Sequence, residues 1–91
     1  MTATARKGGQ TVTVKEAVVS GLQRSYRITA ANAKPTVDYD TVVNTASGWL
    51  EWPANGQVSG TAKQIVTVVD STTSGANARA KGEATLPAPT A

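Results

Sequence analysis

Two carboxylates, Asp38 and Asp40, stand two positions apart in the stretch Thr36–Val43. Residues i and i+2 of a β-strand face the same side, so the pair could act as a general acid and base or ligate Ca²⁺. The loop and the further oxygen ligands that a calcium site needs are lacking around it, and we interpret the pair as a solvated strand face. Asp70 could join a calcium site between strands, but an Asp after an apolar run more often caps a turn.

Residues that support nucleophilic or redox catalysis are sparse. The chain has no Cys and no His, which excludes thiol nucleophiles, disulfides, imidazole catalysis and Cys/His zinc sites. No serine has a His to activate it, no G-x-S-x-G motif occurs, and the glycines form no phosphate-binding loop. We expect a protein that is not an enzyme and that binds no cofactor and no metal. A Ser/Lys dyad, or hydrolysis at Asp38 and Asp40, stays open as the enzymatic alternative.

Charge and hydropathy limit the classes of partner. Nine Lys and Arg against six Asp and Glu give a net charge of +3, and only Arg6 and Lys7 are adjacent basic residues. Nucleic-acid-binding surfaces usually carry denser basic stripes with interleaved aromatic residues, so we expect no nucleic-acid partner. The sequence has no apolar run long enough to span a membrane and no apolar secretion signal, so we expect no membrane partner. From Met1 we expect a complete gene product.

The sequence pattern predicts an all-β domain, because turn-forming residues recur at short intervals and no stretch shows a helical period. The Asn55-Gly56 dipeptide is a strong hairpin signal and predicts that the strands on either side of it pair with each other. Residues 30–34 could form one helical turn. The predicted strands are Thr11–Lys15, Arg24–Ala31, Thr36–Val43, Trp49–Trp52, Gln57–Ser59, Gln64–Val69 and Ala78–Leu86.

The last two of these strands carry the strongest pattern in the sequence. Gln64–Val69 is rich in β-branched residues, and Asp70–Asn77 is a run of turn-forming residues. Ala78–Leu86 then alternates small apolar with polar residues, and we expect a β-bulge where Gly82 interrupts it, with Pro87 ending the strand. The inward-facing positions of this strand would be Ala78, Ala80, Ala84 and Leu86, with Arg79, Lys81, Glu83 and Thr85 facing outward.

The closing sequences VTVVD and ARAKGEATL resemble the final two strands of bacterial Ig-like modules such as the PKD family. The segment Gly21–Ala30 also resembles a fibronectin type III strand, in which a Leu precedes a Tyr-containing strand. These resemblances cover about a third of the chain. They imply an Ig-like β-sandwich of about seven short antiparallel strands, with a small β-barrel or jelly roll as the alternative, and they imply no function.

Flanking segments and aromatic residues suggest how such a domain would bind. We divide the chain into an extended N-terminal arm at residues 1–10, a β-sandwich at 11–86 and a C-terminal tail at 87–91. With few aromatic residues the core must be built from small aliphatic side chains, which favours stabilisation by assembly, so we expect a homo-oligomer or a multi-copy assembly. The predicted partner-binding residues are Arg6, Lys7, Tyr39, Trp49 and Trp52. The two tryptophans would face opposite sides, one of them in the core, unless a bend buries both.

From these features we expect a structural protein of a virion, namely a phage capsid decoration or cement protein. Its polar arms would lie along neighbouring capsid subunits while the sandwich bridges them, with Arg6 and Lys7 meeting acidic patches on the shell. The alternative is an Ig-like binding module of a larger surface or fibre protein that recognises protein or glycan. The corresponding locations are the virion and the extracellular surface.

Overall fold

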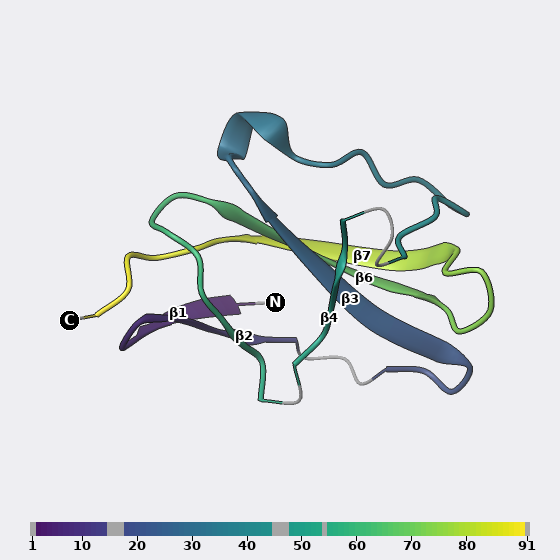
Figure 1. The fold of residues 1–91 in the computed structure, drawn as a ribbon, viewed down its shortest axis with the longest axis horizontal. Coiled ribbons are helices and arrows are strands. Elements are labelled where there is room, and N and C mark those ends of the chain that lie inside the picture. Colours follow the sequence, from purple (N-terminus) through teal and green to yellow (C-terminus); the bar gives the residue numbers. More distant parts are fainter. Residues whose placement is uncertain (1, 15–17, 45–47, 54, 91) are drawn as a thin grey trace.

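The computed structural model describes residues 2–14, 18–44, 48–53 and 55–90 as two antiparallel β-sheets with one short 3₁₀ helix (Figure 1). One sheet has the strand order β1-β2-β5 and the other has the order β4-β3-β6-β7. The expectation of an all-β sandwich is confirmed. The elements are β1 (Thr2–Arg6), β2 (Gly9–Thr13), β3 (Leu22–Thr29), η1 (Ala31–Ala33), β4 (Leu50–Glu51), β5 (Gln57–Val58), β6 (Ile65–Thr72) and β7 (Ala78–Thr85).

Strand β6 is the centre of the larger sheet, and both of its faces are buried. It pairs with β3 along its whole length, from Ile65 opposite Thr29 to Thr72 opposite Leu22. Its pairing with β7 confirms the predicted closing hairpin. Because successive side chains of β6 alternate between faces, Val66 and Val68 face the smaller sheet, whereas Thr67 and Val69 face away from it. We call these the inner and the outer face of the larger sheet.

The sequence predicted a β-bulge at Gly82, but the bulge of β7 lies at Arg79. Asp70 and Ser71 of β6 pair with Ala80 and Ala78, which leaves Arg79 as the extra residue, while Gly82 pairs regularly with Val68. A bulge reverses the alternation of side chains beyond it. Ala78 is therefore buried on the outer face, whereas Ala80 lies on the inner face with Ala84 and is exposed there.

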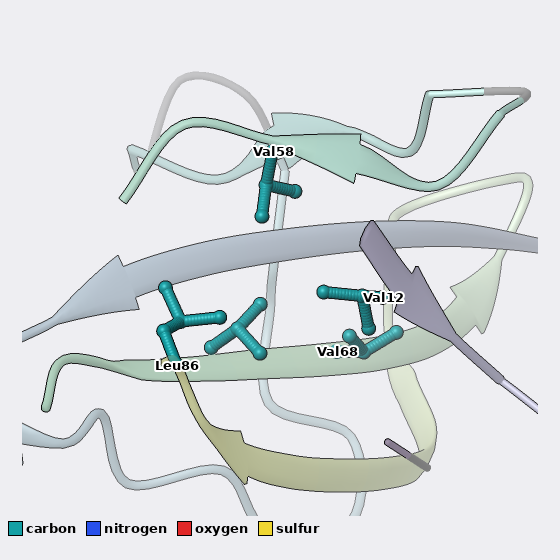
Figure 2. Packing of buried hydrophobic residues seen from close by; sticks show 5 residues of the cluster. Val12, Val58, Val68 and Leu86 are labelled. Carbon is teal, nitrogen blue, oxygen red and sulfur yellow. The ribbon is translucent and has the colours of Figure 1, made fainter. Parts of the chain in front are cut away.

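The inner face carries the main hydrophobic core, which lies between the two sheets (Figure 2). Each member of this core is almost completely buried, and the half-buried Ile28 and Trp52 pack against it. Full burial of an aliphatic side chain contributes about 1.5–3 kcal/mol, so this cluster supplies much of the stability of so small a chain. Its buried members are Val12, Val58, Val66, Val68 and Leu86.

A second, smaller core covers the outer face. Here Val37, Val43 and Trp49 from the β3–β4 connection pack on Val69 and Ala78 of the sheet. Part of this connection runs past η1 along the upper side of the view in Figure 1. It has no strand among its described residues; Val42 forms a single bridge with Asn77. The one-turn helix expected within residues 30–34 is η1.

The stretch Thr36–Val43, which we predicted as a strand, is instead an irregular segment with a tight turn. Thr41 N donates to Asp38 O at 3.1 Å, and Asp38 N donates to Thr41 Oγ1 at 2.9 Å. Asp and Thr side chains can form hydrogen bonds with nearby backbone groups, which compete with the hydrogen bonds of a sheet. The alternation of Val37, Tyr39 and Thr41 predicted a strand because it carries no information about these local hydrogen bonds.

The predicted pairing of Trp49–Trp52 with Gln57–Ser59 is also wrong. β4 pairs with Ser25 and Tyr26 of β3, whereas β5 pairs with Gln10 and Thr11 of β2. A turn does exist at Gly56, which has a φ of 69° and whose N donates to Pro53 O at 3.0 Å. Gly56 O accepts a bond from Val12 N at 2.8 Å, so this turn carries the chain from one sheet to the other.

The N-terminal residues differ from the arm that we expected at 1–10. Thr2–Arg6 is strand β1, joined to β2 through a two-residue loop, Lys7-Gly8, in which Gly8 has a φ of 80°. The tail is held as well, because Thr90 N donates to Arg6 O at 3.0 Å. Both segments therefore lie along the domain, and a boundary at Gln10 falls within β2.

Candidate interaction surface

The most exposed large hydrophobic side chain of the described residues is Tyr39, at 72% exposure. It stands at the tip of the turn that Asp38 and Thr41 close. The next residue, Asp40, has a φ of 69°, in the left-handed region that non-glycine residues rarely adopt. Such backbone strain persists only where surrounding contacts impose it, and it is concentrated at functional sites.

Two side chains hold this turn, one from β7 and one from the β6–β7 connection. The Arg79 guanidinium lies over the Tyr39 ring, with its carbon 4.5 Å from the ring centroid, and donates to an Asp40 carboxylate oxygen. Asn77 Nδ2 donates to Asp40 O at 3.2 Å. Arg79 is the extra residue of the β7 bulge, and a bulge is a common device for redirecting a side chain. Here Arg79 acts as a support for Tyr39 and Asp40.

Backbone hydrogen bonds fix the same turn to the edge of β7. Asp40 N donates to Ala78 O at 3.0 Å, and Ala78 N donates to Thr41 O at 2.8 Å. Val43 N donates to Ala76 O at 2.9 Å. An aromatic side chain on a fixed backbone loses little conformational entropy on binding, which favours interface hot spots of this kind. Tyr39, Asp40 and Arg79 therefore form what we call the Tyr39 surface.

A shallow cavity of about 350 Å³ adjoins the Tyr39 surface. It is lined by residues of both the turn and the bulge, including Val37, Asp38, Ala78 and Lys81. The rim thus combines a carboxylate, an ammonium group and an aromatic ring. Aromatic and Arg side chains surrounded by polar residues are typical of protein–protein interfaces.

The predicted binding residues Arg6 and Lys7 lie at the β1–β2 hairpin, which is at the other end of the long axis from the β6–β7 turn (Figure 1). Arg6 has a structural role, because its Nη2 donates to Val58 O at 2.8 Å and its Nε to Gln10 O at 3.0 Å. Lys7 is exposed. The structure therefore does not bring Arg6 and Lys7 together with Tyr39.

Neither tryptophan stands free at the surface. Trp49 is 4% exposed in the outer core, and Trp52 is half-buried against the inner core. The Trp52 and Tyr26 rings meet edge to face, with centroids 5.8 Å apart. The two do face opposite sides of the larger sheet, as the sequence indicated. Of the five predicted binding residues, Tyr39 and Lys7 are the ones whose side chains are available to a partner.

Sequence reasoning missed a largely buried ion pair on the inner face. Arg24 donates from Nε and Nη2 to the two carboxylate oxygens of Asp70, at 2.7 and 3.1 Å. The Arg24 side chain is 8% exposed and that of Asp70 is 14% exposed, beside a cavity of about 340 Å³. The predicted strands would have placed both residues at strand ends, but their register, opposite each other on β3 and β6, follows only from the pairing.

The candidate calcium ligands are used in other ways. Asp40 pairs with Arg79 and Asp70 with Arg24. Within the described ranges, no group of three or more Asp, Glu, His or Cys side chains is close enough to hold a metal ion. A search of the same residues finds no helix that is long and apolar enough to cross a membrane.

Comparisons with known proteins assign no family to this chain, so a function has to be inferred from the candidate surface. No protein-family model, no curated protein and no solved structure matches this chain. The likeness to Ig-like modules therefore remains a prediction from the closing strands.

Proposed function

We propose that this chain is a non-enzymatic attachment domain that binds another protein through the Tyr39 surface. The single observation that carries the proposal is an exposed tyrosine next to Asp40, which has a left-handed backbone, with the Arg79 guanidinium stacked on the tyrosine ring. A strained backbone that displays an aromatic side chain to solvent has no use in the hydrophobic core, and it fits an interface anchor.

In the form that we propose, the partner is the shell of a virion and the domain is a capsid decoration or cement protein. This revises the mechanism expected from the sequence, in which a free N-terminal arm makes the attachment. Thr2–Arg6 is paired within the domain, so contact through the folded surface is better supported than contact through an extended arm.

The test uses empty shells assembled from the major shell protein that the same genome encodes, with binding measured by co-sedimentation. We expect Tyr39→Ala to weaken binding by about 2 kcal/mol or more, roughly thirtyfold, as for other aromatic hot spots. The matched control is Lys7→Glu at the opposite end, which should bind as the wild type does. Loss of binding with Lys7→Glu alone would instead support the arm mechanism, and absence of wild-type binding to the shells would reject the virion form.

The cavity beside Tyr39 favours the second candidate, a module that recognises protein or glycan on a surface or fibre. Sugar rings commonly stack on an exposed aromatic ring while polar groups at the rim bind hydroxyls. Binding of a labelled glycan array by the wild type, lost in Tyr39→Ala, would select this candidate. A reading frame that extends the domain on either side would favour it as well.

A further inference from the structure

The outer edge of β7 is an unpaired strand edge whose polarity can be derived from its hydrogen bonds. Leu86 N donates to Gln64 O at 2.8 Å, so position 86 directs its backbone groups toward β6. In an antiparallel ladder these directions alternate along the strand. The even-numbered residues therefore bond to β6, while Lys81, Glu83 and Thr85 direct their N–H and C=O groups outward.

The free part of this edge has defined limits. On the N-terminal side, Ala78 bonds to Asp40 and Thr41, and on the C-terminal side Pro87 ends the strand. Between these limits, no other backbone group among the described residues bonds to the outward groups of Lys81, Glu83 and Thr85. An edge of this kind is a template for a further strand unless it is protected.

From this edge we infer that β7 pairs antiparallel with β7 of a second copy of this chain, across a two-fold axis at Gly82. Symmetry then sets Lys81 opposite Glu83 of the other copy, and Glu83 opposite its Lys81. Both residues direct their backbone groups outward. Each of these two pairs is therefore a hydrogen-bonded pair, in which the two residues exchange two N–H···O bonds. The proposal does not rest on the proposed function, although Lys81 also lines the cavity beside Tyr39.

The side chains select this register. Lys81 and Glu83 share the outer face of the sheet, and cross-strand residues have Cβ atoms about 4.5–5.5 Å apart, so both pairs bring opposite charges together. Centring the axis on Lys81 or on Glu83 would instead place like charges opposite each other. Charged residues at a strand edge normally prevent pairing with another strand. Here the Lys81 and Glu83 charges on either side of Gly82 are complementary to those of a second copy, so they favour this copy over strands with other charges.

The inner-face residues of β7 permit the same approach. Gly82 would face its own symmetry mate in a non-hydrogen-bonded pair, where Cα atoms come closest, at about 4.5 Å. Its neighbours on this face are Ala80 and Ala84, which are also small. Glu83 already accepts from Lys34 Nζ at 3.4 Å, an exposed contact that Lys81 of the second copy would share. The two four-stranded sheets would thus become one continuous sheet.

Sedimentation equilibrium of the full chain tests the proposal. The wild type should be dimeric, and Glu83→Lys should weaken the dimer by at least about tenfold, because the substitution acts twice and sets like charges opposite each other. Lys81→Glu should do the same. The double variant K81E/E83K restores opposite charges and should recover the dimer. Thr73→Lys, at the exposed β6–β7 turn, is the control and should leave it unchanged.

Hydrogen exchange separates this register from other contacts between copies. The amides of Lys81 and Glu83 should exchange more slowly as the concentration of ¹⁵N-labelled protein rises, whereas the amide of Gly82, already bonded to β6, should not change. A wild type that is monomeric at about 1 mM, which corresponds to a binding free energy weaker than about −4 kcal/mol, would overturn the proposal. So would a dimer that Glu83→Lys leaves intact, or concentration-dependent protection that misses Lys81 and Glu83.

Discussion

The two faces of the larger sheet are both buried, but they differ in whether their buried polar groups have hydrogen-bond partners. On the inner face, Arg24 and Asp70 form a bidentate ion pair. In the same layer the side chain of Gln10, which is fully buried, donates to Gly60 O and Pro87 O and accepts from Gly60 N, at 2.8–3.0 Å. Every polar atom of that amide group therefore has a partner, as burial requires.

On the outer face, buried hydroxyl groups lack such partners. The hydroxyl oxygens of Ser25, Thr29, Thr67 and Ser71 have no hydrogen-bond partner among the described residues. The sheet ladder places all four on this one face. A buried polar group without a partner costs about 1–3 kcal/mol, so the outer core should contribute less net stability than its burial suggests. The comparison shows that burial alone does not measure how strongly a face is held.

The largest effect is expected from breaking the inner-face ion pair. Asp70→Asn keeps the shape of the side chain but removes the charge that faces Arg24, and loss of one partner of a buried pair typically costs about 3–5 kcal/mol. Urea unfolding monitored by Trp fluorescence would measure this loss. The control is Glu51→Gln on exposed β4, where a change within about 0.5 kcal/mol is expected. An equally small change for Asp70→Asn would remove the distinction between the faces.

Core truncation on the inner face should have the next largest effect. Leu86→Ala should lower the free energy of unfolding by about 3 kcal/mol, because Leu86 is only 1% exposed and packs against strands of both sheets. For a chain of this size that corresponds to a fall in Tm of very roughly 15 °C in calorimetry. Pro87, the next residue, is half-buried, and Pro87→Ala provides the matched comparison, with a smaller fall.

The outer face should respond in the opposite direction when a hydroxyl group is removed. Thr67→Val replaces a fully buried hydroxyl that has no partner by a methyl group of similar volume, and we expect a gain of about 1 kcal/mol in the free energy of unfolding. Thr73→Val at the exposed turn is the control and should change stability by less than about 0.5 kcal/mol. Destabilisation by Thr67→Val would show that the hydroxyl is hydrogen-bonded in solution, for example to a buried water.

The smallest effect is a difference in local opening. The amide of Val43, bonded to Ala76 O outside any strand, should exchange at a lower free energy than the amides of Val66 and Val68 in β6. Native-state hydrogen exchange measures this directly. Equal protection of Val43 and Val68 would mean that the outer cover opens only when the whole domain unfolds.

The sequence by itself determined the class of fold and its most regular part. The β-branched run at Gln64–Val69, the turn residues after it and the alternation from Ala78 predicted the closing hairpin, because these signals are local in the chain. It also identified Tyr39 as a candidate anchor and the two tryptophans as facing opposite sides. The hairpin at Lys7-Gly8 was missed because the T-A-T-A alternation before it contains only small residues, although the two glycines after Lys7 were a usable turn signal.

Only the tertiary structure decided which strands became neighbours. Leu50–Glu51 and Gln57–Val58 flank a good turn, yet each pairs with a strand distant in sequence, since that arrangement buries Val58 between the sheets. The same long-range pairing sets Arg24 opposite Asp70. It also brings the Arg79 guanidinium onto the Tyr39 ring, because one extra residue in β7 shifts the register. Periodicity records which residues alternate along a strand, whereas the partner across the sheet is chosen by packing over the whole chain.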